Sequence, residues 1–141
     1  MRIDGIGGLF IFSNDPAALA AWYGTMFGFE WGDDAGPTTY YMQLWARAET
    51  EDRRVDTSFA IMKAKRTLER VEPPDDPDAV YGHQPFMLNL RVRDLDALLT
   101  HLRAQGVEIL GDSDEGYARF AWVRDPDGHR VALYMPCLLD T

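Results

Sequence analysis

The chain has 141 residues, of which 46% are hydrophobic and 26% are charged, and these values are typical of one globular domain. The formal net charge of −9 argues against nucleic acid and anionic membranes as partners, because both are polyanions that bind basic surfaces. A single cysteine excludes an internal disulfide, and no apolar stretch approaches the roughly eighteen residues of a membrane span. The first residues show no signal-peptide pattern, so the sequence predicts a cytoplasmic protein.

The first half of the sequence predicts one helix among strands. Residues 7–12 are an apolar and aromatic run of strand length, and Asp15 followed by Pro16 is a typical helix start. Apolar side chains then recur at helical spacing as far as Gly28, which is expected to end the helix. The strands predicted after this helix are 29–31, 38–47 and 54–63.

The same order of elements is predicted again in the second half. Residues 86–92 have strand character, Asp94 is a second helix cap, and Gly106 ends the second helix. The strands predicted after it are 107–110, 117–124 and 130–135, the last two joined by the turn Asp-Pro-Asp-Gly. Matching order and spacing indicate an internal repeat.

The predicted fold is therefore α+β, with two βαβββ half-modules in a single domain, 1–141. The half-modules cover about 1–63 and 85–137. A charged, proline-rich connection at 64–84 joins them.

The second face of the predicted strand 86–92 is unusual for a core. Because side chains alternate along a strand, Met87, Asn89 and Arg91 share the face opposite the leucines. An apolar surface with a few placed polar groups suits a ligand pocket. The alternative is a half-solvated sheet face, which is common in antiparallel sheets.

Several motifs resemble those of the glyoxalase/bleomycin-resistance/dioxygenase superfamily, also called the vicinal oxygen chelate proteins. They are Phe-Ser-Asn-Asp-Pro at 12–16, Phe-Gly-Phe at 27–29, Arg-Val-Arg-Asp-Leu-Asp-Ala-Leu at 91–98, and Arg-Phe-Ala-Trp-Val-Arg-Asp-Pro-Asp-Gly-His-Arg-Val-Ala-Leu-Tyr at 119–134. The likeness covers nearly the whole chain outside 64–84. It implies paired βαβββ modules that form a U-shaped mixed sheet around a pocket, helices outside, and frequent homodimers.

The resemblance also implies four metal-ligand positions. Enzymes of the superfamily hold one divalent metal, usually on histidine and glutamate side chains of the first and last strand of each half. The corresponding residues are Gly8, Ala60, Met87 and Ala132. None carries a nitrogen or carboxylate oxygen for a divalent ion, so we expect no metal and no cofactor.

Other reactive residues are expected to have ordinary roles. His83, His101 and His129 lie outside the predicted pocket face and lack ligand spacing, and Cys137 has no cationic neighbour in sequence. Trp122 is predicted to be a core residue. No set of nucleophile, base and orienting residue is found.

The leading hypothesis is metal-independent binding of a small aromatic or apolar organic molecule, as in drug-sequestering members of the superfamily. One alternative is a metal-dependent lyase, isomerase or dioxygenase of the superfamily, whose metal ligands would lie at other residues if the assigned strand register is wrong by one residue. The other is a dimeric α/β barrel with βαββ halves. The residues predicted to contact the ligand are Phe10, Phe12, Met62, Met87, Asn89, Arg91 and Tyr134.

Overall fold

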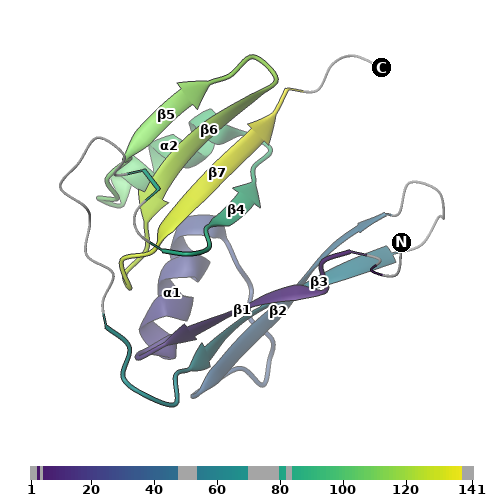
Figure 1. The fold of residues 1–141 in the computed structure, drawn as a ribbon, viewed down its shortest axis with the longest axis vertical. Helices are drawn as coiled ribbons and strands as arrows, with labels where there is room; N and C mark the ends of the chain where they lie inside the picture. The colour runs from purple at the N-terminus through teal and green to yellow at the C-terminus, as the bar shows by residue number, and fades with distance from the viewer. Residues whose placement is uncertain (1–2, 4, 48–53, 70–79, 82–83, 138–141) are drawn as a thin grey trace. The chain divides into compact units, whose positions relative to one another are not determined.

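The computed structural model describes residues 3, 5–47, 54–69, 80–81 and 84–137. The chain forms two compact units, Met1–Leu68 and Glu69–Thr141, and each contains one helix and one open mixed sheet (Figure 1). The predicted α+β class is confirmed. None of the helices in the described residues is long and apolar enough to cross a membrane.

The sheet of the first unit places its earliest strand beside its last. Its strands are β1 (Gly8–Ser13), β2 (Thr39–Arg47) and β3 (Arg54–Lys63), in the order β1-β3-β2. β1 runs parallel to β3, whereas β2 is antiparallel to it. All three strands agree with the predicted ranges to within one residue at each end.

Helix α1 (Pro16–Phe27) begins and ends where the sequence predicts. The Asp15 side chain accepts a hydrogen bond from the Ala18 amide at 3.1 Å, which satisfies a free donor of the first turn. Gly28 ends the helix at a φ of 75°, a conformation that other residues rarely adopt. Leu19 and Tyr23 are fully buried, so α1 supplies much of this unit's core.

The predicted strand 29–31 does not form, and this prediction was wrong. The Gly32 amide donates to the Tyr41 carbonyl at 2.9 Å, so the chain meets β2 only after the predicted segment. Within the segment, the indole N–H of Trp31 donates to the Ala20 carbonyl in α1 at 2.9 Å. These aromatic residues therefore pack with the helix instead of extending the sheet.

The second unit has the full predicted order of strand, helix and three strands. Its elements are β4 (Leu88–Arg91), α2 (Leu95–Ala104), β5 (Gly111–Asp114), β6 (Ala118–Arg124) and β7 (Arg130–Pro136). The sheet order is β4-β7-β6-β5, with β4 parallel to β7 and the other pairs antiparallel. As in the first unit, the first strand pairs in parallel with the last. Figure 1 shows α2 behind this sheet.

Helix α2 repeats the pattern of α1. The Asp94 side chain accepts from the Ala97 amide at 3.1 Å, and Gly106 follows the helix with a φ of 80°. Leu95, Leu99 and Leu102 are buried on its inner side. The apolar helical periodicity therefore identified the packed face correctly.

The second strand of the second unit lies later than predicted. Residues 107–110 form no strand, and the Val107 amide instead donates to the Leu102 carbonyl at the helix end, at 2.9 Å. The Leu110 amide reaches the Trp122 carbonyl at 2.8 Å, and regular pairing begins at the next residue. The strand is thus polar β5, paired with β6, and not the apolar run before it.

Candidate functional site

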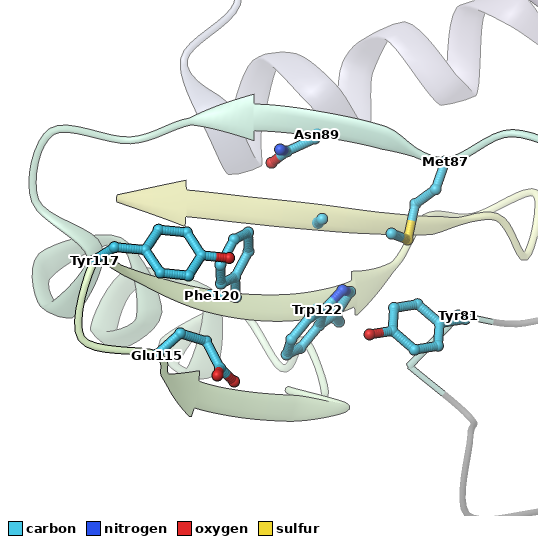
Figure 2. Close-up of a pocket in the computed structure, with 8 residues that line it drawn as sticks. Tyr81, Met87, Asn89, Glu115, Tyr117, Phe120 and Trp122 are labelled. Carbon is cyan, nitrogen blue, oxygen red and sulfur yellow. The ribbon is translucent and has the colours of Figure 1, made fainter. Parts of the chain in front are cut away.

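A pocket of about 250 Å³ lies within the second unit (Figure 2). It occupies the sheet face that carries Asn89, Ala132 and Trp122, which are register partners in β4, β7 and β6. Its lining residues are Tyr81, Met87, Asn89, Glu115, Tyr117, Phe120, Trp122 and Ala132.

Four aromatic side chains, Tyr81, Tyr117, Phe120 and Trp122, form one wall of this pocket, here called the aromatic wall. Phe120 and Trp122 lie on the same face of β6, with ring centroids 5.9 Å apart and planes 15° apart. Tyr117 meets Phe120 edge-on at 6.2 Å, and Tyr81 meets Trp122 edge-on at 6.0 Å. Both tyrosines are more than half exposed, so the wall is open to a ligand from solvent.

Apolar and amide groups oppose this wall. Figure 2 shows Met87 and Asn89 reaching the pocket from β4 and the segment before it. The amide of Asn89 can both donate and accept a hydrogen bond. The indole N–H of Trp122 is buried and has no hydrogen-bond partner among the described residues. The pocket therefore combines apolar surfaces with few directional polar groups, as small-molecule sites do.

One carboxylate lines the pocket. Ser113 in β5 is the register partner of Phe120, and Glu115 follows two residues later. The Ser113 hydroxyl donates a hydrogen bond to Oε1 of Glu115. This bond holds the carboxylate at the pocket margin.

The residues of the second unit that were predicted to contact a ligand lie in different places in the structure. Met87 and Asn89 line the pocket, and the Tyr134 ring packs against Phe120 with centroids 5.3 Å apart. Arg91 is exposed, so its position does not require a buried partner. It lines a second hollow of about 470 Å³, together with Val92, Arg93, Met135 and Pro136.

The other predicted contacts lie in the first unit. Phe10 pairs with Ala60, and Phe12 pairs with Met62, across β1 and β3. Phe10 and Phe12 are 58% and 50% exposed, so they form an apolar surface on this sheet. A ligand role for them and for Met62 stays a prediction.

The family model of the Glyoxalase/Bleomycin resistance protein/Dioxygenase superfamily matches residues 3–133. The chain belongs to this superfamily. No curated protein matches the sequence.

Solved structures with the superfamily's fold cover nearly the whole chain. TnmS3, an antibiotic binding protein from Streptomyces sp. CB03234, is 22% identical, with 97% of this chain and 99% of that chain covered and a TM-score of 0.61. The lactoylglutathione lyase from Agrobacterium tumefaciens is 14% identical, with 96% of each chain covered and a TM-score of 0.64. The fosfomycin resistance protein FosX from Mesorhizobium loti is 13% identical, with 97% of this chain and 96% of that chain covered and a TM-score of 0.61. At these identities the likeness shows the fold alone.

The residues at the four positions where the resemblance implies metal ligands do not fit a metal. Ala60 pairs with Phe10 and Ala132 pairs with Asn89, and Gly8 and Met87 each stand two residues before those partners. The pairs thus occupy equivalent places in the two sheets, which supports the assignment of all four positions. Their side chains offer no hard or borderline donor atom. No group of three or more His, Cys, Asp or Glu side chains gathers elsewhere in the described residues.

The predicted site omitted the residues that make up most of the pocket. Trp122 was expected in the core, but it is only partly buried and lines the pocket with Phe120. The sequence contained a signal that could have placed Phe120 and Trp122 in the pocket. The tight Asp-Pro-Asp-Gly turn sets the β6–β7 register, and this register places Phe120 opposite Tyr134 and Trp122 opposite Ala132. Among the histidines, His83 lies outside the described residues.

Proposed function

We propose that this superfamily member binds a small organic molecule with an aromatic ring system, in the pocket of the second unit and without a metal ion. The stacked pair Phe120 and Trp122 beside an open volume of about 250 Å³ carries this proposal. Such a surface binds flat rings by stacking and apolar burial. Two ligand positions of metal-dependent relatives, here Met87 and Ala132, contribute apolar lining to the same pocket.

The remaining contacts have distinct proposed roles. Asn89 orients a carbonyl or amine of the ligand, and Tyr134 supports Phe120 from the neighbouring strand β7. Phe10, Phe12 and Met62 belong to the sheet of the first unit, and a ligand role for them stays a separate prediction. TnmS3, which has the same fold, is described as an antibiotic binding protein, and this supports antibiotics as one source of ligands.

We also propose that the chain acts as a homodimer in the cytoplasm. β1 and β4 are each paired on one side only within their sheets, and exposed strand edges favour association. A single cysteine, the exposed Cys137, suits a reducing compartment. Light scattering at tens of micromolar tests the dimer, and a monomeric mass would contradict it.

Equilibrium dialysis of acridine against chelator-treated protein tests the binding function. We expect binding without added metal, weakened about three- to tenfold by Tyr117→Ala or Trp122→Ala because each removes one ring of the wall. Phe86→Ala is the matched control, since Phe86 is an 85% exposed aromatic residue outside the pocket lining. Circular dichroism of each variant checks its folding.

Two results would overturn the proposal. One is acridine binding that appears only after zinc, nickel or manganese is added. The other is binding that the folded Tyr117→Ala variant retains in full while Phe86→Ala loses it.

A further inference from the structure

We infer that the ligand of this pocket carries a positive charge, and that Glu115 and the aromatic wall together select cationic aromatic compounds over neutral or anionic ones of the same shape. The inference rests on the proposed binding function and specifies its ligand class.

The charge of the lining is the first argument. Among the eight described residues that line the pocket, Glu115 is the one ionic side chain, and none of the eight is a lysine, arginine or histidine. An anionic ligand would face this carboxylate without compensation. A cationic ligand would form an ion pair with it.

The position of Glu115 is the second argument. Its Oε1 accepts the hydrogen bond from Ser113, which restricts the side chain, whereas Oε2 accepts none from the residues that the structure describes and can bind a ligand. Because Ser113 pairs with Phe120, the carboxylate lies at the end of the stacked rings. A cation resting on these rings is therefore near the carboxylate as well.

The rings themselves are the third argument. The faces of Trp, Tyr and Phe carry partial negative charge and attract cations within about 6 Å of the ring centre. The aromatic wall supplies four such rings to one pocket. Carboxylate and ring faces act in the same direction, so both favour a ligand with a delocalised positive charge.

Two of the basic residues of the second unit line a different cavity. Arg91 and Arg93 belong to the second hollow, which shares no lining residue with the pocket. Arg124 and Arg130 are register partners two residues beyond Trp122 and Ala132 on the same sheet face, but neither lines the pocket, and the fully buried Arg130 donates a hydrogen bond to the Gly128 carbonyl. The formal net charge of −9 adds a long-range attraction for cations, which salt weakens.

Three flat probes of one shape test this inference: N-methylacridinium, neutral acridine above pH 7, and anthracene-9-carboxylate. We expect the cation to bind about five- to tenfold more tightly than acridine, and the carboxylate to bind most weakly. Glu115→Gln should weaken N-methylacridinium binding about three- to fivefold and leave acridine binding unchanged. Added sodium chloride should weaken binding of the cation alone.

Glu108→Gln is the matched control for this experiment. Glu108 is an exposed residue of the same unit outside the pocket lining, and its replacement changes the net charge by the same amount. Equal effects of the two substitutions on binding of the cation, or equal affinities for the cation and acridine, would overturn the inference. The proposed function would still stand in that case, because acridine binds. If none of the three probes binds, the proposed function fails and the inference fails with it.

Discussion

Gly8 lies directly opposite Ser58, so close that a Cβ atom on Gly8 would stand 2.7 Å from the Ser58 carbonyl oxygen. Carbon and oxygen atoms repel each other at this distance, so the spacing of β1 and β3 requires glycine here. The position at which the resemblance to the superfamily implies a metal ligand therefore has no room for a side chain unless the strands move.

Gly8→Ala is expected to lower the free energy of unfolding by about 1–3 kcal/mol because of this overlap. Urea unfolding followed by circular dichroism measures the change. Gly7→Ala is the control, since no atom lies within 4 Å of a Cβ built on Gly7. Equal stability of the two variants would show that the strands can separate without cost.

Divalent metals are expected to leave the melting temperature unchanged. A bound metal at a hundredfold excess over its dissociation constant would stabilise the folded state by about 2.7 kcal/mol. Thermal melts with and without zinc, nickel and manganese measure this, and elemental analysis of untagged protein gives the metal content. About one metal ion per chain would contradict the expectation.

Protonation of His129 is expected to stabilise the fold. Nδ1 of His129 lies 3.7 Å from Oδ1 of the buried Asp125, whose carboxylate raises the pKa of His129 and outweighs the opposing effect of burial. Because the folded-state pKa is raised, this stabilisation is fully present below the ordinary value of about 6.5 and is lost as the pH rises through the folded-state pKa.

The measurement compares His129→Gln with the wild type between pH 5.5 and 8.5. The difference in unfolding free energy should be about 0.5 kcal/mol larger at the acidic end. His101→Gln, at an exposed position on α2, is the control. A difference that grows toward alkaline pH would refute the predicted sign.

Arg91→Met is expected to leave stability unchanged. The guanidinium is exposed, so its removal leaves no buried carboxylate without a partner. Differential scanning calorimetry measures the melting temperature of both proteins. A loss of several degrees would indicate that Arg91 holds an ion pair in the folded protein.

The local signals in the sequence predicted the helices well. Asp15 and Asp94 cap the helices, and Gly28 and Gly106 follow them with positive φ, because these features depend on a few neighbouring residues. β5 was missed because Gly-Asp-Ser-Asp has low intrinsic strand preference. Its pairing with β6 overrides that preference.

The candidate site was harder to predict than the fold. Asn89 and Met87 were found from strand alternation, which is a local pattern. Tyr81 comes from the predicted connection at 64–84, where no periodicity indicates which side chain turns inward. Glu115 and Tyr117 flank a turn, and their approach to Phe120 follows only from the pairing of β5 with β6.

The small side chain of Ala132 leaves room in the pocket for a ligand. This side chain is a single methyl group, 2% exposed, between its register partners Asn89 and Trp122. A glutamate here would supply the carboxylate that the resemblance implies for a metal site, and its added bulk would occupy the space beside the indole of Trp122. The side chain at position 132 can therefore either leave space for a flat ring or carry a carboxylate for a metal, but not both.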